Sequence, residues 1–233
     1  MRLIGLTGNI ASGKSTVARM LAERGAVIVD ADVLAREVVR PGAPALARIV
    51  ERWGEGVLSP DGALDRPELR QVVFADRQQL EELNAIVHPE VERLREERVA
   101  AARAAGAPLV VCDIPLLFER HLADRFDQIV LVDAPRPLRL ERLVRDRGLH
   151  EAEAMDMIAA QMPAELKRAR SDHVIDNTGT LDDLRLRVDE VWDALVGDAA
   201  ARPAPGRTTD ARGPAAGRLR DDSALLDPGV RQG

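Results

Sequence analysis

The sequence predicts an α/β protein built on a doubly wound, five-stranded parallel sheet. Its apolar runs lack the strict alternation of half-exposed strands, which indicates strands buried on both faces. Helical patterns separate these runs, as βαβ units require. A glycine-rich turn joins the first run to the first helical pattern. The expected strands are residues 2–6, 26–29, 109–112, 129–132 and 173–175.

The glycine-rich turn is a complete G-x-x-x-x-G-K-[ST] motif, made of Gly8, Asn9, Ile10, Ala11, Ser12, Gly13, Lys14, Ser15 and Thr16. In this motif, backbone N–H groups at a helix N-terminus point into a concavity that stabilises phosphates. Lys14 is expected to reach the β- and γ-phosphates of a nucleotide, and the Ser15 hydroxyl to bind Mg²⁺. A chance match is disfavoured because a strand and a helix flank the turn in the required order. The motif predicts a P-loop NTPase-type fold.

Composition excludes several classes of partner. The 233 residues include three Phe, two Trp and no Tyr, so base-stacking surfaces are scarce, and the net charge of −6 also disfavours nucleic acid. No apolar stretch approaches the ~20 residues that span a bilayer. The chain enters strand material at once, with no room for a signal peptide, so we expect a cytoplasmic protein. We also expect a monomer or small homo-oligomer. Cys112 is the only cysteine and is expected to be a buried, inert thiol.

The spacing of the expected strands predicts the domain organisation. About 75 residues between the second and third strands have helical patterns only, at 36–40, 45–53, 67–74, 77–87 and 89–105. We expect one P-loop domain over 1–196, with a core of 1–58, 106–134 and 172–196, a helical insertion of about 59–105 and a lid of about 135–171. Residues 197–233, rich in Ala, Gly, Pro and Arg, are expected to be a disordered tail.

The expected lid consists of two helices, 135–147 and 151–162, of which the first carries five arginines. These arginines are suited to closing over phosphates. They are equally suited to a solvated face with ion pairs such as Glu141 with Arg145. The sequence leaves both interpretations open.

Two carboxylates follow expected strands. The second strand is expected beside the first, which places Asp32 near the phosphate site, where a kinase needs a group that accepts a hydroxyl proton. The alternative is that Asp32 caps the following helix. Asp113 ends the third strand, where an acidic residue either helps to hold Mg²⁺ or caps the strand end. The predicted Mg²⁺ ligands are therefore Ser15 with Asp32 or Asp113.

Several short segments occur together in a specific order, namely 6–16, Asp30-Ala31-Asp32, Ala35-Arg36, 62–66, His88-Pro89, 115–119 and Ile175-Asp176-Asn177. With these segments, the chain resembles the dephospho-coenzyme A kinase family over roughly residues 1 to 196. The resemblance implies transfer of the γ-phosphoryl of ATP to the ribose 3′-hydroxyl of dephospho-coenzyme A. This reaction is the last step of coenzyme A synthesis.

The family pattern also implies residue roles. It makes Asp32 the general base and brings Arg142 to the phosphates and Asn177 to the adenine. The residues it directs toward the acceptor are Arg66, His88, Pro115, Leu116, Leu117 and Glu119. The chain departs from the pattern at Asn9 and Ala11, which often are glycine, at Arg139, which often is glutamine, and at Met157, which often is arginine. The two loop substitutions leave the backbone unstrained if φ is negative at both positions.

Overall fold

The structure is a computed structural model that describes residues 1–74 and 76–197. The described chain divides into two compact units. The first contains residues 1–29 and 102–197, and the second contains residues 30–101 apart from the undescribed position. The predicted tail, apart from Gly197, lies outside the described residues. The predicted boundaries of the insertion and lid stay predictions.

The first unit contains a five-stranded sheet in the order β2-β3-β1-β4-β5. Its strands are β1 (Arg2–Gly8), β2 (Val27–Asp30), β3 (Leu109–Asp113), β4 (Gln128–Asp133) and β5 (His173–Asp176). β1 pairs in parallel with β3 and β4, and β4 with β5. The predicted fold class is thus confirmed. The expectation that β2 lies beside β1 is wrong, because β3 and β4 occupy both hydrogen-bonding edges of β1.

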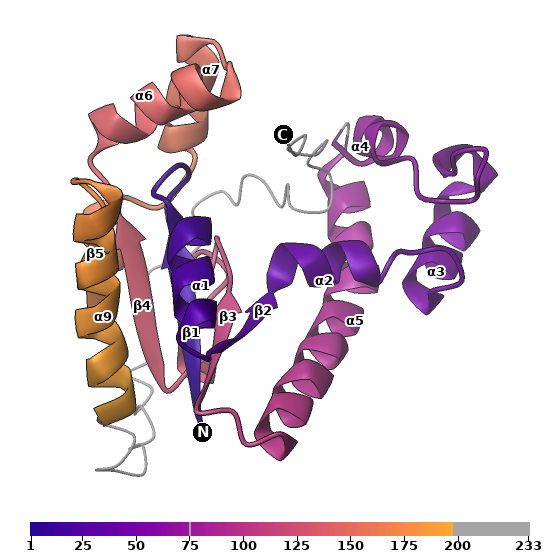
Figure 1. Cartoon of the computed structure of the whole chain (residues 1–233). Coiled ribbons are helices and arrows are strands. Elements are labelled where there is room, and N and C mark those ends of the chain that lie inside the picture. The colour runs from indigo at the N-terminus through magenta and orange to yellow at the C-terminus, as the bar shows by residue number, and fades with distance from the viewer. Residues whose placement is uncertain (75, 198–233) are drawn as a thin grey trace, which may run out of the picture. The chain divides into compact units, whose positions relative to one another are not determined.

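One face of this sheet is covered by α1 (Lys14–Glu23) and α9 (Leu181–Gly197), which lie side by side (Figure 1). Ile4 and Leu6 of β1 pack there with apolar side chains of both helices. Gly5 points to the opposite face, where a Cβ atom would lie 2.6 Å from Cδ1 of Leu117. β1 therefore makes apolar contacts on both faces of the sheet, as the sequence predicts. Cys112 is fully buried in β3, as predicted.

The segment predicted to be a lid has three helices where two were expected, namely α6 (Arg136–Arg147), α7 (Glu151–Ala159) and α8 (Ala164–Arg168). The predicted helix 151–162 is too long because Pro163 disfavours helical backbone before it and starts α8 instead. Leu143, Ala154 and Ile158 form the lid core. Ile10 and Ala11 of the glycine-rich loop pack against that core, so the loop and the lid share one apolar cluster.

The second unit is helical. It contains α2 (Ala31–Glu37), α3 (Pro44–Trp53), the short η1 (Glu55–Val57), α4 (Arg66–Phe74) and most of α5 (Arg77–Ala104). The expected helix 36–40 is displaced, since α2 already begins after Asp30. The two helices expected around His88-Pro89 are one, α5, with Pro89 inside it. A proline removes one backbone donor from a helix, and the packing of Leu83, Val87 and their neighbours in the core of this unit outweighs that loss.

Candidate active site

The glycines of the loop between β1 and α1 permit a left-handed backbone and close contacts that other residues would not. Gly13 has φ 93°, a left-handed conformation, and a Cβ atom there would overlap Nδ2 of Asn177. A Cβ atom on Gly8 would lie 2.6 Å from the backbone oxygen of Val132. Both glycines of the motif are therefore required by close approach of other groups. Lys14 and Ser15 begin α1, where the helix N-terminus and its dipole favour an anion.

Lys14 and Asp113 form an ion pair between the loop and the end of β3. The register pairs Leu6 of β1 with Asp113, so the carboxylate lies at the edge of the sheet where the loop begins. Asp113 is 3% exposed. Lys14, a residue of the glycine-rich motif, therefore compensates a buried negative charge. The predicted contacts of Lys14 with phosphates and of Asp113 or Ser15 with Mg²⁺ stay predictions.

Arg142 and Asn177 meet at the loop, although they come from α6 and from the residue after β5. The Asn177 Nδ2 donates to the Ser12 carbonyl at 2.8 Å. The Arg142 guanidinium donates to the carbonyls of Ala11 at 3.1 Å and of Asn177 at 3.2 Å. The structure thus brings three predicted nucleotide-binding elements together. Arg142 uses these donors on backbone oxygens, and its contact with phosphates stays a prediction.

The sequence left open whether the arginines of α6 close over phosphates or form a solvated face with ion pairs. Arg145 and Arg142 differ in this respect. Arg145 is exposed and donates to Glu141 at 2.8 Å and to Asp146 at 2.7 Å, so it belongs to a solvated face. Asp146 beside it raises the pKa of Arg145 above its ordinary value. Arg142 instead faces the loop.

The backbone of Ala11 is strained. The sequence predicts no strain if φ is negative at Asn9 and Ala11, and Ala11 does not meet this condition. Asn9 is not among the described residues with positive φ, but Ala11 has φ 60°. A side chain in the left-handed region costs about 1–2 kcal/mol, and glycine avoids this cost at the expense of a more flexible unfolded chain.

We expect Ala11→Gly to raise the free energy of unfolding by about 0.5–1 kcal/mol, because the relieved strain exceeds the added entropy of the unfolded chain. Urea unfolding monitored by circular dichroism measures it. Ala18→Gly in the middle of α1 is the matched control and should lower stability by about 1 kcal/mol. Equal losses in the two variants would contradict the strain at Ala11.

A second set of contacts joins the loop to the lid through residues that the sequence analysis missed. The Ile10 N–H donates to Gln161 Oε1 at 2.7 Å, and Asn9 Nδ2 donates to the Met162 carbonyl at 3.3 Å. The Met162 N–H in turn donates to Glu119 Oε1 at 3.1 Å. Two successive lid residues therefore connect the phosphate-binding loop with the segment after β3.

Glu119 is also the partner of Lys167, the other lysine of the chain. The Lys167 Nζ lies 2.8 Å from Glu119 Oε1, and its side chain is fully buried. Burial lowers the pKa of Lys167, and the Glu119 carboxylate opposes that change. The scarcity of lysine was the one sequence signal that could have singled out Lys167. Glu119, predicted to bind the acceptor, contacts Met162 and Lys167, and its role toward the acceptor stays a prediction.

We expect Lys167→Met to lower the free energy of unfolding by about 3 kcal/mol, because it leaves the largely buried Glu119 carboxylate without its cation. The double variant Glu119→Gln/Lys167→Met should recover most of this loss, since no uncompensated charge remains. Urea unfolding of the two variants and the parent measures both effects. A double variant no more stable than Lys167→Met would show that the unpaired Glu119 charge does not cause the loss of stability.

Asp32 lies in the first turn of α2, in the second unit, and is half-buried. The hypothesis that Asp32 caps this helix is wrong, because the cap is Asp30. The Asp30 Oδ1 accepts from the N–H groups of Asp32 at 2.8 Å and Val33 at 3.2 Å. The earlier carboxylate thus fills the capping position, and the Asp32 side chain is not used for it. Its role as general base stays a prediction.

The second unit also holds the other residues predicted to face the acceptor. Arg66 begins α4, and His88 lies within α5, both half-buried. Burial lowers the pKa of Arg66, and the positive charge of Arg36 lowers it further. Two guanidinium groups therefore lie within electrostatic reach of each other, and Arg36 shares a face of α2 with Asp32, one turn away. Arg36 entered the sequence analysis only as part of the family pattern.

The segment after β3 has a packing function in the first unit. The Pro115 carbonyl accepts from the Thr7 hydroxyl at 3.0 Å, next to the loop. Leu117 is fully buried against the sheet, whereas Leu116 is half-buried. The predicted acceptor contacts of Pro115, Leu116 and Leu117 stay predictions.

Within the described residues, no helix has the length and apolar character to cross a membrane.

Comparisons with known proteins agree with this geometry. The family model described as dephospho-CoA kinase matches residues 2–183. A dephospho-CoA kinase from Thermobifida fusca is 49% identical over 195 residues, which cover 84% of this chain and 96% of that protein. One from Streptomyces avermitilis is 51% identical over 197 residues, covering 84% and 95%. The crystal structure of TT1252 from Thermus thermophilus has a TM-score of 0.72 and 40% identity, covering 83% of this chain and 97% of that one. The chain belongs to the dephospho-CoA kinase family.

Proposed function

We propose that this protein transfers the γ-phosphoryl group of ATP to the 3′-hydroxyl of dephospho-coenzyme A. The observation that carries the proposal is the family match over residues 2–183, which includes the phosphate-binding loop, the second unit and the lid. The loop geometry supports the ATP half of the reaction, because its required glycines and the α1 N-terminus are suited to binding an anion.

The loop groups would act mainly by electrostatics. The transition state of phosphoryl transfer spreads negative charge over three equatorial oxygens, so positioning and positive charge supply most of the catalysis. Lys14 would stabilise this charge after its ammonium moves from Asp113 to the phosphates. The donors present fit Mg²⁺, which prefers oxygen ligands and usually takes one or two protein groups together with phosphates. Ser15 would hold it, with Asp113 or Asp32, and the bound ion would neutralise charge on the phosphates.

The second unit would bind the acceptor. Dephospho-coenzyme A carries a diphosphate, and Arg36 and Arg66 offer two neighbouring cations whose mutual repulsion an anion would offset. Asp32, one turn from Arg36, would accept the proton of the 3′-hydroxyl as it attacks. Asn177 at the loop is the proposed contact for adenine. Lid closure would exclude water and prevent wasteful hydrolysis of ATP.

A coupled assay of ADP release tests this function. The full chain is incubated with ATP, Mg²⁺ and dephospho-coenzyme A, beside ATP alone and beside adenosine or shikimate as acceptors. We expect rapid ADP release only with dephospho-coenzyme A, and a product that has gained one phosphate at the 3′ position by ³¹P NMR. Equal release with another acceptor would favour a different small-molecule kinase. Release without any acceptor would favour a regulatory ATPase.

The cellular expectations are part of the same proposal. A cytoplasmic location, a monomer or small homo-oligomer and the lack of nucleic-acid partners stay predictions from the sequence. Size-exclusion chromatography with light scattering measures the oligomeric state.

A further inference from the structure

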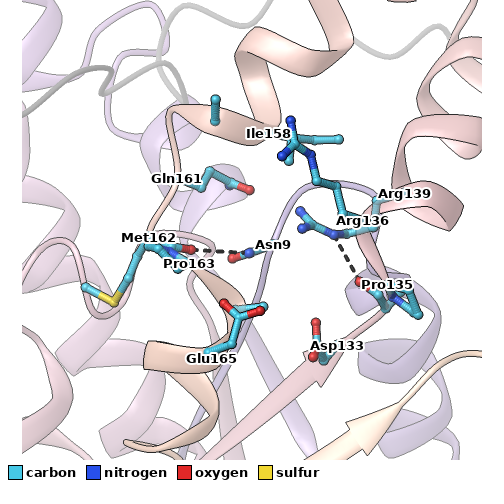
Figure 2. Close-up of a pocket in the computed structure, with 13 residues that line it drawn as sticks. Asn9, Asp133, Pro135, Arg136, Arg139, Ile158, Gln161, Met162, Pro163 and Glu165 are labelled. Atoms are coloured by element: carbon cyan, nitrogen blue, oxygen red, sulfur yellow. Dashed lines mark hydrogen bonds between the residues drawn. The ribbon is translucent and has the colours of Figure 1, made fainter.

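A cavity of about 330 Å³ lies in the first unit, at the carboxyl end of β4 (Figure 2). Arg136 and Arg139 of α6 border it on one side. Gln161, Met162 and Pro163, between α7 and α8, border it on the other. Its volume is at the lower end of the range for small-molecule sites. Apart from Asn9, its lining residues are not among those that the family pattern gives to ATP or dephospho-coenzyme A.

Arg139 is the unusual group in this lining. It is 4% exposed, and its Nε donates to the Ala134 carbonyl at 3.0 Å. One terminal nitrogen, Nη1, is buried and has no hydrogen-bond partner among the described residues. Burial lowers the pKa of Arg139, yet a guanidinium stays protonated in proteins. The cavity wall thus contains a charged donor whose burial is only partly compensated, a costly arrangement.

The carboxylates near Arg139 do not supply the missing partner. Asp133 accepts from Arg168 at 2.9 Å. The hydrogen bonds of Arg168 with Asp176 and, second, with Asp133 raise the pKa of Arg168. Glu165 is exposed. Both carboxylates favour the charged form of Arg139, and Arg136 opposes it. None of them makes a hydrogen bond to Nη1.

A second polar atom in the lining also lacks a partner. Asn9 is 5% exposed, and its Nδ2 donates to the Met162 carbonyl, but its Oδ1 is buried with no hydrogen-bond partner among the described residues. The cavity therefore presents a cationic donor and a neutral acceptor. Ile158, Met162 and Pro163 add an apolar surface to the same lining.

We propose that this cavity binds a small organic oxyanion, a carboxylate or a phosphate ester, through the guanidinium of Arg139. The charged end of the ligand would accept from Nη1, and its apolar part would lie against Ile158 and Met162. Charge-assisted hydrogen bonds to a guanidinium are strong enough to make such a site selective for oxyanions.

Calorimetric titration of the full chain tests the proposal, with saturating ADP and Mg²⁺ to occupy the loop. The probes are inorganic phosphate and butyrate, with chloride at equal ionic strength as the reference. We expect saturable binding of at least one oxyanion and a Kd at least tenfold higher in Arg139→Gln. Arg147→Gln, which removes the same charge from an exposed position of the same helix, should bind like the parent.

Two further variants keep the proposal falsifiable if Arg139→Gln folds poorly. Ala159→Phe leaves Arg139 in place but fills the cavity edge, and it should also abolish binding. Lys14→Ala/Asp113→Asn removes the cation of the loop and should bind the oxyanion normally. Binding of phosphate alone would identify phosphate esters as the ligands, and binding of butyrate alone would identify carboxylates. The proposal is overturned if neither probe binds, if Ala159→Phe binds normally, or if binding depends on Lys14 and not on Arg139.

Discussion

We expect Lys14→Ala to lower kcat by about 10³-fold. The ammonium is the cation that the loop supplies to the developing charge of the transferred phosphoryl group, and loss of one such electrostatic contact typically costs 10²–10³ in rate. The coupled assay with saturating ATP and dephospho-coenzyme A measures it. The loss should appear chiefly in kcat, because the loop amides still bind the phosphates.

The ion pair with Asp113 complicates this variant and also supplies its control. Without Lys14, the buried Asp113 carboxylate loses its cation, and stability should fall by about 3 kcal/mol. The double variant Lys14→Ala/Asp113→Asn should recover the stability but not the activity. If the double variant also recovered kcat to within tenfold of the parent, the loss in Lys14→Ala would be a folding defect and not a loss of catalysis.

We expect Asp32→Asn to lower kcat by about 10²–10⁴-fold, with little change in the KM for ATP. A general base contributes a factor of this size, and an amide of the same shape cannot accept the hydroxyl proton. Steady-state kinetics over a range of pH measures it. The variant should also lose the acidic limb of the pH–rate profile, which a purely structural change would not remove.

Asp30 provides the matched control, since it lies two residues away at the start of the same helix. Asp30→Ala removes the cap of α2 and should cost about 1 kcal/mol of stability, while kcat stays within a few-fold of the parent. Near-normal turnover in Asp32→Asn would refute its assignment as general base. A larger loss of kcat in Asp30→Ala than in Asp32→Asn would transfer the assignment to Asp30.

Much of the first unit could be predicted because its signals are local. An apolar run, a glycine motif and a helical pattern within the first 23 residues are enough to specify β1, the loop and α1. The five strands were found within one or two residues of their observed bounds for the same reason, since a buried parallel strand is a continuous apolar run.

Predictions failed where distant contacts decide between locally similar choices. Pro89 normally ends a helix, but the apolar core of the second unit holds α5 together across it. Asp30 and Asp32 are both good capping residues by composition, and only the start of α2 selects Asp30. The order of the strands depends on hydrogen bonds between segments far apart in the chain, so nothing local placed β3 between β1 and β2.

The sequence by itself determined the phosphate-binding loop, the parallel sheet and the kinase family, because these depend on residue types at short, fixed spacings. Only the tertiary structure decided that Ala11 takes a left-handed backbone, that Lys167 is buried on Glu119, and that Arg139 faces a cavity with an unsatisfied nitrogen. Each of these features depends on desolvation or on backbone geometry imposed by neighbours in space. The free energy of such groups is set by what surrounds them, which the order of residues along the chain does not specify.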